Sequence, residues 1–219
     1  MIAENIINTS ITPLKPTDTV DRAIQWMEEL KVSHLPIVED FKFLGLANEV
    51  YLLDQTNLPL VETGLEFRKV ACKSSDHIFD VISILNQYKV STIAVLDEKE
   101  NYIGSITTQD LFNWISTQSA FQQSGGIIVL VTHQHNYSLS EISQIVESND
   151  TKILYTSIVN DNIDPTKIKL FLKLNKEDLT RVVDAFERYE YTIVATFSQG
   201  DIRNETQDRL DNLIKYINI

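Results

Sequence analysis

The sequence of 219 residues predicts an α+β protein made of two parts. A pattern of one amphipathic helix and two short strands occurs twice within about the first 118 residues, offset by 58 positions. The rest of the chain reads as strand, helix, strand, strand, helix, strand. A run rich in Ser, Thr and Gln, residues 116–124, separates the parts and predicts a linker.

The first part is an internal duplication of about sixty residues. Apolar residues at helical spacing begin at Val20 and again at Ile78. Polar residues before each stripe predict the helix caps, Thr17 or Asp18 in the first copy and Ser75 or Asp76 in the second. The matched stripes are Val20, Ala23, Ile24, Met27 and Leu30 in the first copy, and Ile78, Val81, Ile82 and Leu85 in the second.

Each helix is followed by a predicted pair of strands and a second helix. The short β-branched runs 35–38 and 92–96 lead through polar turns to strands that contain Gly45 and Gly104. A unit of this size buries its own sheet poorly. We therefore expect the two copies to pack sheet to sheet.

The second part has the order β-α-β-β-α-β. Its two middle strands predict a hairpin across 160–166, and its crossovers place both helices on one face of a four-stranded sheet. The expected elements are strand 127–132, helix 138–147, strand 153–159, strand 168–173, helix 176–188, strand 192–196 and a last helix, 205–217.

The turn from Gly104 to Asp110 is the main candidate site. Thr107 is placed to cap the following helix, so its hydroxyl and the free N–H groups of the first turn meet at one spot. Asp110 projects from the same turn and is suited to accept hydrogen bonds from a diol. The alternative is an ordinary helix cap with a solvated carboxylate.

The tandem pattern, with 34–38 reading His-Leu-Pro-Ile-Val and Gly-x-x-Thr-x-x-Asp at 104–110, resembles a pair of cystathionine-β-synthase (CBS) domains, also called a Bateman module. The resemblance implies repeats at 1–60 and 61–120 that bind adenine nucleotides or related adenosyl ligands between the copies. It implies that Thr107 and Asp110 bind the ribose and phosphate. It also implies that Gly104, in the strand before them, belongs to the same ligand site. The adenine is then expected near Thr92, Ile93, Val70 and Cys72.

The first copy departs from this pattern. Asn48 and Tyr51 stand where the second copy has Thr107 and Asp110, and Glu49 adds negative charge. We therefore expect the first cleft to be empty or filled by Tyr51, and at most one competent nucleotide site per chain.

The second part, residues 125–219, resembles a ferredoxin-like ACT domain, and the whole arrangement is similar to CBS-plus-ACT proteins of the acetoin-utilisation type. ACT domains often bind amino acids at dimer interfaces. The loop 133–138 has neither the Pro nor the Gly usual in the ACT ligand loop. We expect this domain to act mainly as a dimerisation platform, which a large uncovered sheet face would support.

Composition excludes several other classes. The net charge of −12 disfavours binding to nucleic acid or anionic lipid. The lone Cys72 and the absence of a basic, apolar leader favour a cytoplasmic protein, and no apolar run is long enough for a membrane span. His133 and His135 lack a third ligand in sequence, so we expect no metal site.

These observations predict a regulatory module without catalysis. We expect no required cofactor, a homodimer, a regulated protein partner, and AMP, ADP, ATP or S-adenosylmethionine as regulatory ligand. The alternative from another class is a structural dimerisation or interaction protein with vestigial clefts. An enzyme of acetoin metabolism is a third reading, which rests on the similar arrangement alone.

Overall fold

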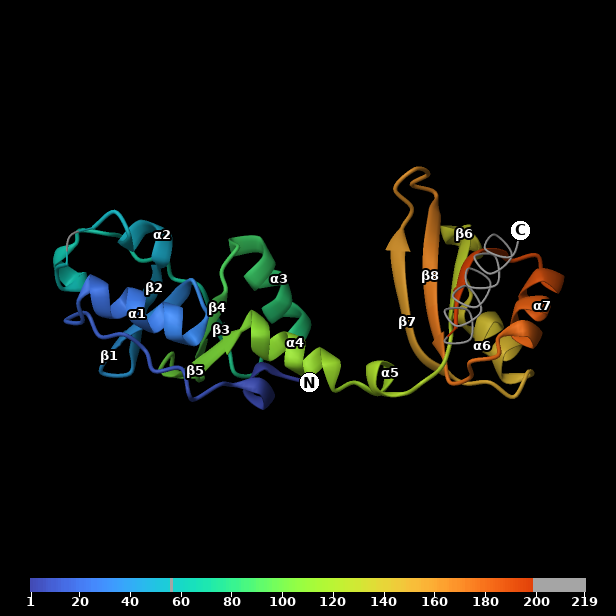
Figure 1. The fold of residues 1–219 in the computed structure, drawn as a ribbon, viewed down its shortest axis with the longest axis horizontal. Helices are drawn as coiled ribbons and strands as arrows, with labels where there is room; N and C mark the ends of the chain where they lie inside the picture. Colours follow the sequence, from blue (N-terminus) through green and yellow to red (C-terminus); the bar gives the residue numbers. More distant parts are fainter. Residues whose placement is uncertain (56, 199–219) are drawn as a thin grey trace, which may run out of the picture. The chain divides into compact units, whose positions relative to one another are not determined.

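A computed structural model describes residues 1–55 and 57–198, and the chain divides into two compact units, Met1–Ser116 and Thr117–Ile219 (Figure 1). Both helices and strands occur in each unit, in agreement with the predicted α+β class. Among the described residues, no helix is long and apolar enough to cross a membrane.

The first unit contains the two repeats. The first repeat forms a two-stranded antiparallel sheet, and the second forms a three-stranded sheet of order β3-β4-β5. The elements are η1 (Ala3–Ile6), α1 (Val20–Leu30), β1 (His34–Glu39), β2 (Lys42–Asn48), α2 (Glu49–Leu52), η2 (Leu60–Glu62), β3 (Ala71–Lys73), α3 (Ile78–Tyr88), β4 (Thr92–Leu96), β5 (Tyr102–Thr107) and α4 (Thr108–Ser116).

The strand register repeats along with the sequence. His34 pairs with Asn48 in β1 and β2, and Thr92 pairs with Thr107 in β4 and β5. The register of each hairpin shifts once, at equivalent places near its turn. β4 packs against both strands of the first repeat, so the two sheets meet face to face as expected.

The helix caps differ from the prediction. Thr19 caps α1 and His77 caps α3, one or two residues after the predicted caps. The carboxylates of Asp18 and Asp76 instead accept hydrogen bonds from the backbone N–H groups three residues earlier, at 2.7 and 2.8 Å. They close a turn before the helix, which leaves the next residues free to cap it.

Each repeat sends its N-terminal extended segment across the glycine strand of the other repeat. The segment with Ile7 crosses β5 at Gly104, where Asn8 donates its N–H to the carbonyl of Ser105 at 2.8 Å. The segment with Phe67 crosses β2 at Gly45 in the same way. This exchange explains why both strands need glycine, since a Cβ at either position meets the crossing segment within 2.5 Å.

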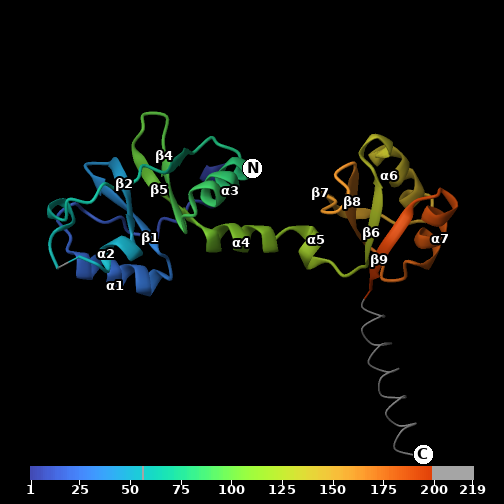
Figure 2. The ribbon, with the colours of Figure 1, turned by 90° about the horizontal axis from the view of Figure 1, so that it is seen from above.

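The second unit has the predicted order of elements and an antiparallel sheet of order β7-β8-β6-β9. Helices α6 and α7 cover one face of this sheet and bury a single apolar core against β6 and β8 (Figures 1 and 2). The elements are α5 (Ser119–Gln122), β6 (Ile127–His133), η3 (Gln134–Asn136), α6 (Leu139–Glu147), β7 (Ile153–Asn160), β8 (Lys167–Leu174), α7 (Thr180–Arg188) and β9 (Thr192–Phe197).

Three elements differ from the sequence prediction by more than a residue at an end. The predicted linker contains the short helix α5, and α2 is a single turn rather than a full helix. Helix α7 begins at Thr180 instead of residue 176, because Asp178 accepts a hydrogen bond from the Thr180 N–H and the Lys176 carbonyl binds the N–H of Gly126. The predicted helix 205–217 lies outside the described residues.

Candidate functional site

The turn between β5 and α4 forms a reciprocal cap. The Thr107 hydroxyl oxygen accepts from the Asp110 N–H at 3.0 Å, and Oδ2 of Asp110 accepts from the Thr107 N–H at 2.9 Å. The hydroxyl of Thr107 also donates to the same Oδ2, at 2.6 Å. The side chain of each residue therefore accepts a hydrogen bond from the backbone N–H of the other at the first turn of the helix. This is the capping-box arrangement with Asp in place of Glu.

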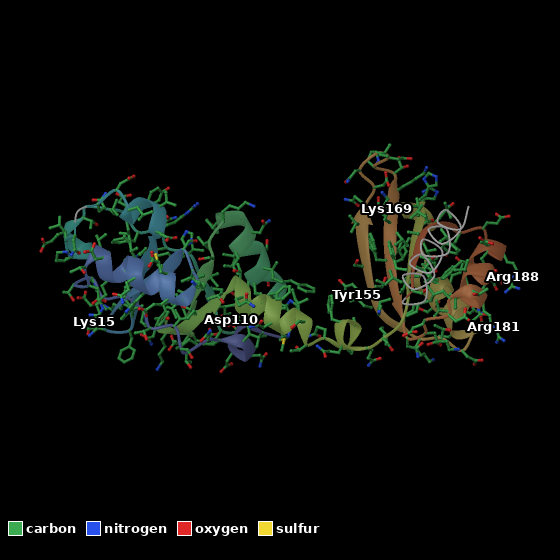
Figure 3. All side chains as sticks on the ribbon, viewed as in Figure 1. Lys15, Asp110, Tyr155, Lys169, Arg181 and Arg188 are labelled. Atoms are coloured by element: carbon green, nitrogen blue, oxygen red, sulfur yellow. The ribbon has the colours of Figure 1, made fainter. Side chains whose placement is uncertain are left out.

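The second carboxylate oxygen of Asp110 binds a different segment. The side-chain amide of Asn8 donates to Oδ1 at 3.0 Å, and Asp110 lies at the start of α4 beside this N-terminal segment (Figure 3). The other side-chain atom of Asn8, Oδ1, accepts from the Ser10 N–H at 2.9 Å. Asp110 thus holds a donor that comes from 102 residues earlier in the chain.

All four residues expected around the adenine are buried. Val70, Cys72 and Ile93 are buried in the core of the second repeat, with at most 4% of their surface exposed. Burial, and secondarily the negative charge of Asp76, raises the pKa of Cys72 to about 12, so this residue stays a thiol. Thr92 is fully buried too, and no described group hydrogen-bonds its hydroxyl.

A cavity of about 280 Å³ lies at the cleft of the first repeat. Tyr51 does not fill it, because the ring lines the wall and is 64% exposed. Of the two expectations for this cleft, an empty cleft or one filled by Tyr51, the second is wrong. The lining residues are His34, Leu46, Asn48, Tyr51, Leu65, Glu66, Phe67, Arg68, Tyr88, Lys89 and Val90.

His34 is the buried polar residue of this cavity. Its Nε2 lies 2.8 Å from the amide nitrogen of Asn48, whose Oδ1 accepts from the Val50 N–H, and its Nδ1 lies 3.2 Å from the backbone nitrogen of Ser91. Its Nδ1 lies 3.1 Å from the hydroxyl of Ser33 and 3.3 Å from that of Ser91, the matching serine of the other repeat. Burial lowers the pKa of His34, so the ring is neutral at neutral pH.

Two cationic side chains, Arg68 and Lys89, also line the cavity. The guanidinium carbon of Arg68 lies 4.5 Å from the centroid of the Tyr88 ring, and Lys89 donates to Asn86 at 2.8 Å. Among the described residues, no carboxylate lies within ion-pair distance of Arg68, although Glu66 also lines the cavity.

The sequence prediction missed Asn8, Arg68 and His34. In the structure Asn8 lies opposite Ser105 and Arg68 lies opposite Leu46, at matching places in the two repeats. That these segments cross to the other repeat is a tertiary feature, which the linear pattern does not contain.

The second unit has a separate cavity of about 360 Å³ beside the end of β6. Its carboxylates are Glu141 and Glu190, and the Tyr191 hydroxyl donates to Glu141 at 2.5 Å. The rings of His133 and His135 stack at 5.4 Å, and both side chains are exposed. Within residues 1–55 and 57–198, no group of three or more His, Cys, Asp or Glu side chains is arranged to hold a metal ion.

Comparison with known proteins finds similarity in the first unit. Residues 3–55 and 67–117 match the family model of the CBS domain. A curated relative, inosine-5'-monophosphate dehydrogenase from Korarchaeum cryptofilum (strain OPF8), is 26% identical over 112 residues, which are 50% of this chain and 23% of the relative. The chain therefore matches less than a quarter of that enzyme's length.

Two solved structures are similar to the same region. CBSX2 in complex with AMP is 18% identical, covers 52% of this chain and 95% of its own, and has a TM-score of 0.45. A CBS domain pair in complex with 5'-methylthioadenosine and S-adenosyl-L-methionine is 19% identical, covers 53% of this chain and 96% of its own, and has a TM-score of 0.44.

Proposed function

Because residues 3–55 and 67–117 match the family model of the CBS domain, we propose that this chain is a non-catalytic regulatory module that binds an adenosine-containing ligand. The ligand occupies the cleft of the second repeat and acts by rearranging a homodimer, which in turn regulates a protein partner in the cytoplasm. No cofactor is required. A ligand that prefers one arrangement of the dimer shifts the population toward it.

The observation that carries this proposal is the environment of Asp110. One carboxylate oxygen is held by Thr107, and the other accepts a hydrogen bond from the Asn8 amide. A ribose hydroxyl presents the same kind of donor as that amide, so a diol can replace Asn8 without leaving the carboxylate unpaired. Thr92, whose buried hydroxyl has no described hydrogen-bond partner, pairs with Thr107 across the strands and supports a polar ligand there.

The proposed site includes Gly104 and the strand residues behind it. Gly104 lets the crossing segment with Ile7 approach, which brings Asn8 to the cap. The apolar floor of this site is the core of the second repeat, to which Val70, Cys72 and Ile93 belong. These three side chains lie beneath the site and do not form its walls.

The net charge of −12 favours ligands with few phosphate groups, because each added negative charge is repelled and only partly screened at physiological salt. We therefore expect AMP and S-adenosylmethionine to bind more tightly than ADP and ATP. AMP, ADP, ATP and S-adenosylmethionine make the panel for testing.

Calorimetric titration of the full chain with AMP, ADP, ATP and S-adenosylmethionine tests the proposal. Asp110→Ala removes the diol acceptor and abolishes binding, whereas Asp80→Ala, a first-turn carboxylate of α3, leaves it unchanged. No binding of any of the four, or binding indifferent to Asp110→Ala, contradicts the proposal.

For the second unit, we propose an ACT-like module of ferredoxin-like topology that serves as the dimerisation platform. The order β7-β8-β6-β9 with both helices on one face supports this assignment. On the other face, Tyr155, Val159 and Phe197 are exposed hydrophobic residues, from 47% to 58%.

The same apolar face favours a second candidate function, a structural dimerisation protein that binds no nucleotide. Light scattering separates the two functions. The regulatory module changes its association or hydrodynamic size when AMP is added, and the structural protein is an oligomer that no nucleotide alters.

A further inference from the structure

The cleft of the first repeat has side-chain chemistry unlike that of the Thr107–Asp110 turn. In place of a carboxylate that accepts from a diol, it has the Tyr51 ring. In place of Asn8, the crossing segment contributes Arg68, a cation. Compared with the Thr107–Asp110 turn, this cavity therefore lacks the carboxylate that accepts from a ribose and has a positive charge and an aromatic surface instead.

The geometry points to a second binding site, in which the first-repeat cavity takes a small planar aromatic phosphate monoester without need of a ribose. This goes beyond the proposed function, which concerns the second repeat and an adenosine ligand. The cavity volume of about 280 Å³ is at the lower end of small-molecule sites, which suits a single ring with one phosphate.

Arg68 is prepared to bind the phosphate. Stacking on Tyr88 restricts the guanidinium group, so less side-chain entropy is lost when it binds an anion. A guanidinium binds two oxygens of a phosphate at once, and no carboxylate of the described residues occupies it as an ion pair. With Lys89 and Glu66, the charged lining side chains sum to one positive charge, in a chain whose net charge is −12.

The remaining walls suit the ring of the ligand. Tyr51 and Tyr88 present aromatic surface to the cavity, alongside the apolar side chains of Leu46 and Val90. The His34 ring is held between Asn48 and the serines of the two repeats, so it is a fixed wall rather than a mobile ligand.

Calorimetric titration of the full chain with phenyl phosphate and, separately, with adenosine tests this inference. Phenyl phosphate has the ring and the anion but no ribose, and adenosine has the ribose but no phosphate. We expect phenyl phosphate to bind, and Arg68→Gln to weaken it at least tenfold. Arg68→Lys keeps the charge but loses the two-oxygen geometry, so it weakens binding to an intermediate degree.

Matched controls separate this pocket from general charge effects. Lys69→Gln makes the same charge change at the neighbouring exposed residue and leaves the affinity within twofold. Asp110→Ala leaves phenyl phosphate binding unchanged, and Arg68→Gln leaves adenosine binding unchanged. Benzoate, with the same ring and a single negative charge, binds more weakly than phenyl phosphate.

Several results overturn the inference: no saturable phenyl phosphate binding, equal losses in Arg68→Gln and Lys69→Gln, benzoate binding as tight as phenyl phosphate, or a requirement for Asp110. Chemical denaturation of each variant checks that it is folded. If none of AMP, ADP, ATP and S-adenosylmethionine binds while phenyl phosphate binds through Arg68, the proposed function fails and this inference stands.

Discussion

Asn8 and Asp110 are hydrogen-bond partners from distant parts of the sequence. Their hydrogen bond joins the N-terminal segment to the first turn of α4, at the spot where a ribose diol is proposed to bind. In the free protein Asn8 is an internal competitor for the ligand. Thr107, the other hydrogen-bond partner of Asp110, does not compete with the ligand, because it caps the helix whether or not a ligand is bound.

Replacing Asn8 by Ala therefore raises the affinity for AMP. A hydrogen bond to a charged group contributes about 1.5 kcal/mol, so its removal from the free state corresponds to about a tenfold gain in affinity. Calorimetry on Asn8→Ala measures this gain. Ser10→Ala, in the same segment, is the control, and an unchanged or weaker affinity of Asn8→Ala would show that the two contacts do not compete.

His34 makes the stability of the first unit depend on pH. Burial lowers its pKa below the ordinary value of about 6.5, so the unfolded chain binds the proton first as the pH falls. The stabilising contribution of neutral His34 is complete above pH 6.5 and declines as the pH falls toward the lowered pKa. Urea denaturation at pH 7.5 and 5.5 measures the difference, which shrinks in His34→Gln and persists in the control His135→Gln.

At the scale of elements, the exchange of extended segments between repeats determines what surrounds each cleft. The segment of one copy crosses the glycine strand of the other, so each cleft combines a helix start with a side chain from the opposite repeat. The two clefts share this backbone plan. Their chemistry differs because the crossing segment brings Asn8 to one and Arg68 to the other.

The two glycines differ in how they respond to a side chain. A Cβ at Gly45 meets the backbone carbonyl oxygen of Phe67 at 2.5 Å, whereas a Cβ at Gly104 meets the end of the Ile7 side chain at 2.3 Å. Backbone moves less readily than a side-chain methyl, so Gly45→Ala destabilises the first unit more than Gly104→Ala. Both lose stability through the positive φ, by about 1 kcal/mol or more.

Urea denaturation of the two variants tests that order. Gly64→Ala is the matched control, since Gly64 also has a positive φ but nothing within 4 Å of its Cβ. A larger loss for Gly104→Ala than for Gly45→Ala would contradict the backbone argument.

At the scale of the whole molecule, the chain has two units with separate hydrophobic cores. We expect two thermal transitions in calorimetry, because each core can be exposed without the other. AMP raises only the transition of the first unit, which is the one that Gly45→Ala lowers. A single transition raised as a whole by AMP would mean that the units unfold cooperatively.

The sequence by itself determined the duplication, the order of elements and the candidate turn. Periodic apolar residues and turn residues are local signals, so the helices and strands of both units followed from them, with boundaries off by a few residues at α2 and α7. The cap that Thr107 provides was predicted as well, because both residues belong to one turn, whereas the hydrogen bond from the Thr107 N–H to the Asp110 carboxylate was not.

Only the tertiary structure decided what faces each cleft. The contact of Asn8 with Asp110 spans 102 positions, and the Arg68 side chain reaches Tyr88 in a cavity that the altered motif of the first copy led us to expect either empty or filled by Tyr51. Such contacts depend on how the segments cross between repeats and on which side chains fill the space. A pattern read along one strand or helix does not carry that information, because it comes from packing between distant parts of the chain.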